Sequence, residues 1–235
     1  MIKKIRVIVI SMAIVLGITA CGKENISDDS KTNSNSSQQV IINTDEERKS
    51  DNDNILIAYF TRVGNTNFPD NVDANTSASL NKSNDDMKGN TQIVAEMIQK
   101  SAGGDLFLIQ TKEKYAADYN SVLDDAQKEK SNDTHPKLAS KFSNMDQYDV
   151  IFIGFPNWWS DMPMSVYSFF DEYDLAGKTI IPFCTSGGSG FSNNIETIKE
   201  LETEAIVLDG LSINDSEVMD SKQKVEQWIM GLGLN

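Results

Sequence analysis

The sequence predicts an α/β domain: a doubly wound, five-stranded parallel sheet in the strand order 2-1-3-4-5, with helices on both faces. Two observations carry this prediction. Residues 55–60 and 149–155 are short, nearly continuous apolar runs, as expected for parallel strands that are covered on both faces. Runs of this kind then alternate along the chain with segments of helical periodicity, which favours a sheet whose strands are connected by helices.

Each element of the predicted domain, residues 54–235, follows from a local pattern. Strands are expected at 55–60, 105–110, 149–155, 179–184 and 204–208. Helices are expected at 92–100, 118–130, 164–173, 193–201 and 220–232. The first helix has its apolar residues on one face and ends at Gly103-Gly104. Pro163 suits the first turn of the third helix, whereas the second helix has a weaker pattern and is expected to be exposed.

The topology indicates where a ligand would bind. In a doubly wound sheet, ligands bind at the carboxyl ends of the strands where the strand order reverses, so the loops after strands one, three and four should meet. These loops offer hydroxyl groups and amides suited to a phosphate, two indole rings suited to stacking, and small residues that allow close backbone approach. Together they point to FMN as the ligand. The candidate residues in these loops are Thr61, Pro156, Asn157, Trp158, Trp159, Thr185, Ser186, Gly187, Gly188, Ser189 and Gly190.

The phosphate loop poses a choice because Gly-Asn-Thr occurs twice, at residues 64–66 and 89–91. Pro69 and the lack of periodicity argue against a helix that starts at Thr66, whereas helical periodicity begins after Thr91. Phosphate binding uses amides at a helix start, so Gly89, Asn90 and Thr91 are the better candidates. We therefore expect a split loop, with residues 64–88 as an insertion that is looped out. Within it, the hydroxyl groups of residues 72–79 either cap the phosphate or belong to a plain surface loop.

Several candidates also have a plain structural explanation. Trp158 and Trp159 are either hydrophobic plugs over the sheet edge or ligand-facing, and two consecutive indoles cannot both face a core. Cys184 closes an apolar run and is expected to be a buried core residue. His135, the only histidine, lies in a polar stretch and is expected at the surface. The sequence contains no zinc-ligand spacing and no nucleophile-elbow or Walker motif, so no catalytic residue and no metal site is predicted.

The N-terminus predicts export. A positive segment and a short apolar segment precede Ile18-Thr19-Ala20-Cys21, which resembles the lipobox of bacterial lipoproteins. Residues 1–20 are then a lipoprotein signal peptide, Cys21 is lipidated, and the polar residues 21–53 form a disordered tether. The alternative is a plain signal peptide in which Cys21 is incidental. The lipoprotein interpretation places the domain outside the cytoplasm, anchored to the bacterial cell membrane by lipid alone.

The acidic composition of the chain argues against one class of binding partner. Asp and Glu number 35 against 21 Lys and Arg, which gives a formal net charge of −14. Such a balance argues against nucleic acid, whose binding depends on basic contacts to phosphates.

The loop motifs and the strands before them resemble a flavodoxin-like, FMN-binding family that is widespread in bacteria and includes lipoproteins. The resemblance rests on residues 55–61, Gly-Asn-Thr, residues 155–159, Met162-Pro163 and residues 181–190, and it extends from Asn54 to the C-terminus. It implies a flavodoxin fold, bound FMN, and a role in electron transfer with a redox partner protein or a small-molecule acceptor. By position, Thr61 and the Gly-Asn-Thr turn would hold the phosphate, while residues 156–159 and 185–190 would flank the ring. Where well-known flavodoxins carry an acidic, tyrosine-bearing segment after strand four, this chain has Ser and Gly, which puts the ring environment in doubt.

Two other functions remain open at this stage, and whether the protein is an enzyme is undecided. An FMN-dependent reductase of quinones or similar small acceptors would turn over with a nicotinamide donor. A flavodoxin-fold binding or scaffold lipoprotein without FMN would be colourless.

Overall fold

The structure is a computed structural model that describes residues 54–69, 79–83, 86–139, 141 and 144–234. The expected signal peptide 1–20, the lipidation site Cys21 and the tether 21–53 lie outside the described residues. No helix within the described ranges is long and apolar enough to cross a membrane.

The sheet is parallel and has the predicted strand order. Its main path runs β4-β1-β5-β6-β7, and β8 also pairs with β6. The strand bounds are β1 Ile55–Tyr59, β4 Asp105–Leu108, β5 Val150–Pro156, β6 Thr179–Ser186, β7 Ile206–Val207 and β8 Leu211–Asn214. Counting along the sequence, this is the order 2-1-3-4-5, which confirms the predicted doubly wound architecture.

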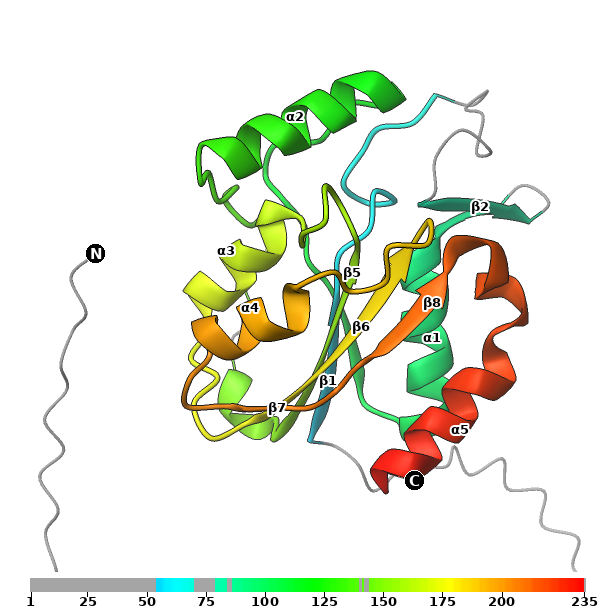
Figure 1. Cartoon of the computed structure of the whole chain (residues 1–235), viewed down its shortest axis with the longest axis vertical. Coiled ribbons are helices and arrows are strands. Elements are labelled where there is room, and N and C mark those ends of the chain that lie inside the picture. Colours follow the sequence, from blue (N-terminus) through cyan, green and yellow to red (C-terminus); the bar gives the residue numbers. More distant parts are fainter. Residues whose placement is uncertain (1–53, 70–78, 84–85, 140, 142–143, 235) are drawn as a thin grey trace, which may run out of the picture. The chain divides into compact units, whose positions relative to one another are not determined.

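Helices cover both faces of the sheet (Figure 1). α1 (Asn90–Ala102) and α5 (Lys222–Leu232) pack on one face, where their buried residues join Ile55, Ile57 and Phe152. α3 (Met164–Glu172) and α4 (Asn194–Leu201) lie on the other face. α2 (Tyr119–Ser131) begins at the expected place, with Asp118 as its N-cap, and it lies beyond the carboxyl ends of the strands.

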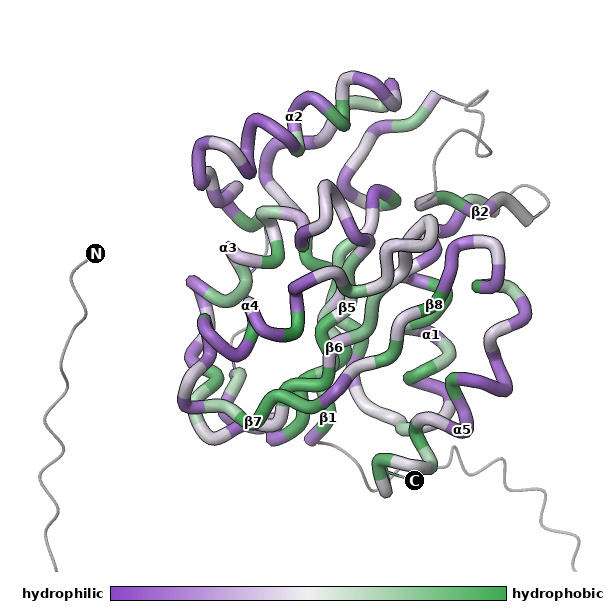
Figure 2. The backbone as a smooth tube through the Cα atoms, viewed as in Figure 1, coloured by the Kyte–Doolittle hydropathy of each residue, from purple (hydrophilic) through white to green (hydrophobic). Residues whose placement is uncertain are grey.

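The core explains why the strands are continuous apolar runs. Every residue of β1 is buried, with Leu56 and Ala58 facing one helical layer and Ile55 and Ile57 facing the other. Figure 2 shows the same pattern as a hydrophobic band along the strands of the sheet.

The fifth strand differs from the prediction of 204–208. The edge of the sheet is divided into β7, only two residues long, and β8, and both pair in parallel with β6. Between them lies Gly210, where a Cβ atom would lie 2.1 Å from the carbonyl oxygen of Pro182. Because the backbones approach this closely, the edge strand is interrupted and resumes three residues beyond the predicted end.

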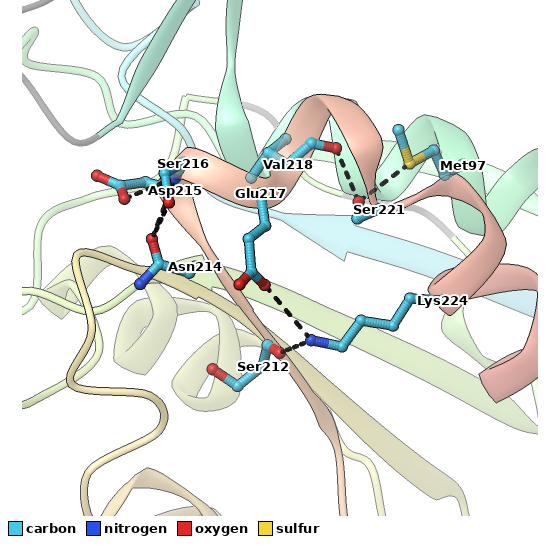
Figure 3. A network of polar contacts seen from close by, with 9 residues as sticks. All are labelled: Met97, Ser212, Asn214, Asp215, Ser216, Glu217, Val218, Ser221 and Lys224. Carbon is cyan, nitrogen blue, oxygen red and sulfur yellow. Dashed lines mark hydrogen bonds and ion pairs between the residues drawn. The ribbon is translucent and has the colours of Figure 1, made fainter.

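A polar network fixes the segment after β8 (Figure 3). η3 (Asp215–Asp220) is a 3-10 helix capped by Asn214, whose Oδ1 accepts hydrogen bonds from the amide and hydroxyl of Ser216. Ser221 then donates to the carbonyl oxygen of Val218 at 2.7 Å and contacts the sulfur of Met97 in α1 at 3.5 Å. This network starts α5 at Lys222, two residues later than predicted, and ties it to α1.

The insertion 64–88 is predicted to be looped out, but part of it is ordered against the domain. Its end forms a hairpin of β2 (Leu80–Ser83) and β3 (Asp86–Gly89), which are antiparallel. β3 leads directly into α1, so the hairpin delivers Gly89 to the helix start. Of residues 72–79, only Ser79 is among the described residues.

Candidate functional site

The three predicted loops meet around one cavity of about 320 Å³ at the carboxyl ends of the strands. The loop after β5 contributes Pro156, Asn157, Trp158 and Trp159, and the end of β6 contributes Thr185, Ser186 and Gly187. Arg62 and Ser79 line a further part of the wall. The remaining wall comes from α2. This is the position that the reversal of strand order specifies for a ligand.

Thr61 and Gly89, at the two ends of the predicted split loop, lie in close contact. Thr61 follows β1 and is almost fully buried, and a Cβ atom on Gly89 would lie only 1.6 Å from its Oγ1 atom. Only glycine allows the strand end and the helix start to come this close. The structure therefore brings Thr61 and residues 89–91 together across the insertion.

The start of α1 has the properties of an anion site. Gly89 is the N-cap and supplies no side-chain cap, and no acidic residue lies in the first turn. The amide of Asn90 donates to the carbonyl oxygen of Ser79 at 2.9 Å, which leaves Thr91 and Gln92 to offer first-turn amides along the positive end of the helix dipole. The hydroxyl of Thr91 shares a 2.9 Å hydrogen bond with Thr185, a cavity residue, so the helix start adjoins the cavity.

The first Gly-Asn-Thr copy is a structural brace. Asn65 is fully buried, and its amide group donates to the carbonyl oxygens of Thr61 and Ile109, both at 2.9 Å. Its Oδ1 atom accepts from the backbone amide of Thr111 at 2.8 Å. The backbone of Thr66 forms an isolated parallel β-bridge with that of Tyr115. No helix starts at this copy, as predicted, and it ties the β1 loop to the segment after β4.

The Trp158-Trp159 pair sits in a strained turn. Trp158 and Asp161 exchange backbone hydrogen bonds of 2.8 and 2.9 Å around Trp159 and Ser160, whose φ angles are 55° and 60°. Consecutive left-handed residues define a type I′ turn, which usually takes Asn and Gly, so a tryptophan here stores strain of about 1–3 kcal/mol. Strain of this kind clusters at functional sites.

The two indoles have different surroundings. Trp158 packs edge-on against Phe60 at 5.3 Å and Tyr115 at 5.6 Å between ring centroids, so it plugs the core while lining the cavity. Trp159 is 46% exposed and donates from its Nε1 atom to the carbonyl oxygen of Leu123 at 3.1 Å. Trp158 is therefore a hydrophobic plug that also lines the cavity, while Trp159, which lines the cavity as well, joins its rim to α2.

The loop after β6 is held by side-chain hydrogen bonds. Ser186 Oγ accepts from the amide of Gly190 at 2.9 Å, and Asn157 donates to the carbonyl oxygen of Gly190 at 2.8 Å. Gly188 and Gly190 have φ angles of 122° and 58°, which explains the glycines. Residues 185–187 line the cavity, whereas Gly188, Ser189 and Gly190 do not and instead shape the loop.

Sequence reasoning missed part of the wall. Arg62 lines the cavity but is not among the predicted site residues, and the helix predicted at 118–130 is expected to be exposed. In the structure its apolar stripe faces the cavity. The spacing of that stripe, i, i+1 and i+4, was the available signal. The residues of α2 in the wall are Tyr119, Val122, Leu123 and Ala126.

Burial raises the pKa values of three groups that do not line the cavity. Desolvation raises the pKa of Glu129 to about 7, and Tyr115, which donates to it at 3.0 Å, has its pKa raised mainly by the same cause. Cys184 is a buried core thiol, as predicted, and this burial raises its pKa to about 12. His135 pairs with Asp171 and Asp133 away from the cavity wall. Among the described residues, no group of three or more His, Cys, Asp or Glu side chains could hold a metal ion.

The fold and the cavity define a doubly wound α/β protein with a ligand site at the reversal of strand order. A family model described as Flavodoxin matches residues 82–232, so the chain belongs to the flavodoxin family. No curated protein matches the chain.

Three solved structures are similar to it. A protein of Bacteroides eggerthii, provisionally described as a flavoprotein, is 26% identical with a TM-score of 0.59, and the match covers 77% of this chain and 98% of that one. A protein of Bacteroides uniformis with the same description is 29% identical, with a TM-score of 0.58 and coverage of 75% and 97%. A flavoprotein of Lactobacillus acidophilus, solved in complex with FMN, is 20% identical, with a TM-score of 0.51 and coverage of 72% and 97%, and this likeness concerns the fold alone.

Proposed function

We propose that this flavodoxin binds FMN noncovalently in the cavity and takes part in electron transfer. The observation that carries the proposal is the convergence of a helix start, an indole pair and a small-residue loop on one cavity. Its volume of about 320 Å³ lies at the lower end of the range of small-molecule sites, roughly 300–1,000 Å³. The FMN complex of the Lactobacillus acidophilus protein, which shares the fold, supports the same ligand.

The residues present fit this cofactor. Thr61 and the first turn of α1 would hold the phosphate, because they offer hydroxyl and amide donors without an acidic residue. Trp158 and Trp159 would flank the planar ring, and residues 185–187 would border it. When bound, FMN supplies the redox chemistry, and the chain contributes binding, orientation and electrostatics.

The cavity wall supports a carrier more than an acid–base catalyst. Within the described part of the chain, its only titratable side chains are Arg62 and Tyr119, and it includes no carboxylate, histidine or cysteine. The alternative is an FMN-dependent reductase of quinones or similar small acceptors. One observation favours it: Trp159 and Tyr119 are exposed at the rim, where a planar acceptor would stack. Turnover with a nicotinamide donor and a quinone would establish the reductase.

An FMN titration of the purified chain, followed by absorption and by quenching of flavin fluorescence, tests the proposal. We expect saturable binding with flavin bands. A colourless chain that binds no added FMN would instead indicate a binding or scaffold lipoprotein.

Two isosteric variants in the same titration locate the phosphate. Thr91→Val removes the hydroxyl at the helix start, and we expect FMN affinity to fall roughly tenfold, about 1.4 kcal/mol. Thr66→Val should leave affinity within about twofold, because the Thr66 hydroxyl is buried and has no hydrogen-bond partner among the described residues. The reverse ranking would assign the phosphate to residues 64–66.

We also propose that the protein acts outside the cytoplasm, anchored to the cell membrane through lipid on Cys21, and exchanges electrons with a redox partner protein or a small acceptor. The support is the lipobox sequence at residues 18–21. Cys21→Ser is expected to move the chain from the membrane fraction to the soluble fraction, because burial of acyl chains contributes about 0.8 kcal/mol per CH₂ group. Unchanged membrane association of the variant would argue against a lipid anchor at Cys21.

A further inference from the structure

A buried arginine stands in the cavity wall. Arg62 directly follows Thr61, its residue is only 2% exposed, and it lines the cavity. Guanidinium groups stay charged in proteins, and a buried charge is costly unless it is paired and hydrogen-bonded. The partners of Arg62 are therefore informative.

The described residues satisfy Arg62 only in part. Its Nη2 atom donates to the carbonyl oxygens of Ala117 at 2.9 Å and Ala116 at 3.2 Å, and its guanidinium lies 5.0 Å from the ring centroid of Phe68. Its Nε atom is buried and has no hydrogen-bond partner among the described residues. It forms no ion pair with any described carboxylate. The Asp118 carboxylate influences it electrostatically, but only at longer range.

Among the described residues no carboxylate forms an ion pair with this charge, and the other side chains of the cavity wall are neutral. Carbonyl groups satisfy hydrogen bonds of a cation, but they do not neutralise its charge. Burial accordingly lowers the pKa of Arg62, and the weaker influences of Tyr119 and Asp118 oppose this. An anionic ligand would supply the missing partner, and the planar guanidinium suits a phosphate group.

We propose that Arg62 selects the phosphorylated flavin, by placing a buried positive charge beside the phosphate end of the cavity so that FMN is bound in preference to riboflavin. The position follows from the chain itself, because Arg62 adjoins Thr61, which contacts Gly89 at the start of α1. This inference rests on the proposed FMN binding and deepens it. It assigns the preference for FMN over riboflavin to the side chain of Arg62, a charged residue outside the uncharged Gly-Asn-Thr motif.

A purely structural role gives a different expectation. Through Ala116 and Ala117, Arg62 clamps the loop after β1 to the segment that precedes α2. If this clamp were its whole role, losing it would loosen the cavity for any flavin. FMN and riboflavin would then be weakened equally, because the phosphate would make no difference.

The test is a titration of the full chain, freed of bound flavin, with FMN and with riboflavin, using quenching of flavin fluorescence. The variants are Arg62→Gln, which removes the charge, Arg62→Lys, which keeps the charge but loses the planar fork, and Lys112→Gln, a matched loss of charge at an exposed position outside the wall. We expect Arg62→Gln to reduce the preference for FMN over riboflavin about 10- to 100-fold, as for a lost hydrogen bond to a charged group. Riboflavin affinity should stay within about twofold.

The controls separate charge from clamping. Arg62→Lys should keep most of the preference even if it lowers the urea midpoint, and Lys112→Gln should keep all of it. Equal losses of FMN and riboflavin affinity, or an unchanged preference in Arg62→Gln and Arg62→Lys, would overturn the inference while leaving flavin binding intact. Failure of the wild-type chain to bind either flavin would overturn both this inference and the proposed function.

Discussion

Gly89→Ala is expected to lower FMN affinity at least tenfold and to destabilise the domain by about 1–3 kcal/mol, the range for overpacking a close-packed site. The added Cβ atom would lie 1.6 Å from Thr61 Oγ1 and 2.8 Å from Thr61 Cβ. Rotation of Thr61 would remove the first clash but not the second. The strand end must therefore separate from the helix start, which opens the site proposed for the phosphate. Urea denaturation and FMN titration measure the two effects.

Gly231→Ala is the matched control. Gly231 lies within α5, and nothing approaches within 4 Å of the Cβ position there, so alanine should stabilise the helix by about 0.5–1 kcal/mol. A second comparison uses Thr61→Gly, which removes the atoms in conflict. In that background Gly89→Ala should cost less free energy of unfolding than in the wild type. Equal costs in both backgrounds would show that Thr61 and Gly89 do not pack against each other.

The central strands of the fold could be predicted because their residue pattern is compatible with only one kind of strand. β1 and β5 are apolar without alternation, which only a strand covered on both faces accommodates. Helical periodicity between the strands then required parallel connections, and the strand order followed.

The sheet edge could not be predicted as well, because an edge strand is specified by fewer contacts. In β8, Leu211 and Ile213 are buried while Ser212 and Asn214 are partly exposed, which is a period of two over only four residues. The apolar pair Ile206 and Val207 gave the stronger local signal, although Ile206 is exposed. Pairing with β6 decided the outcome, and pairing is not local information.

The candidate site likewise has one part that could be predicted from the sequence and another that could not. Topology alone places the loops after β1, β5 and β6 together, so most of the proposed ligand-facing residues could be predicted. The position of α2 depends on contacts between distant residues, such as the Trp159–Leu123 hydrogen bond and the 3.1 Å ion pair of Lys130 with Asp161. Its contribution to the wall was therefore hidden in a pattern that resembles an exposed helix.

Asn65→Ala is expected to destabilise the domain by about 3 kcal/mol, although Asn65 belongs to the Gly-Asn-Thr copy that we do not assign to the phosphate. The substitution leaves the buried carbonyl oxygens of Thr61 and Ile109 and the amide of Thr111 without their side-chain partner. Each unsatisfied buried group costs about 1–3 kcal/mol, and partial relaxation keeps the sum below the maximum. A lower urea midpoint at an unchanged m-value would show the loss of stability.

Asn67→Ala, two residues further on, is the control for this prediction. Asn67 is exposed, so its substitution should change stability by no more than about 0.5 kcal/mol. Substitutions in the two Gly-Asn-Thr copies should also have different effects. Loss of the Asn65 brace should lower stability, whereas a change in the proposed phosphate site should lower FMN affinity. Saturating FMN should stabilise Asn65→Ala by as much as it stabilises the wild type, because binding is intact, whereas loss of the hydroxyl at the start of α1 should weaken binding first. If Asn65→Ala unfolds like the wild type and instead loses FMN, residues 64–66 hold the phosphate, and the split loop is wrong.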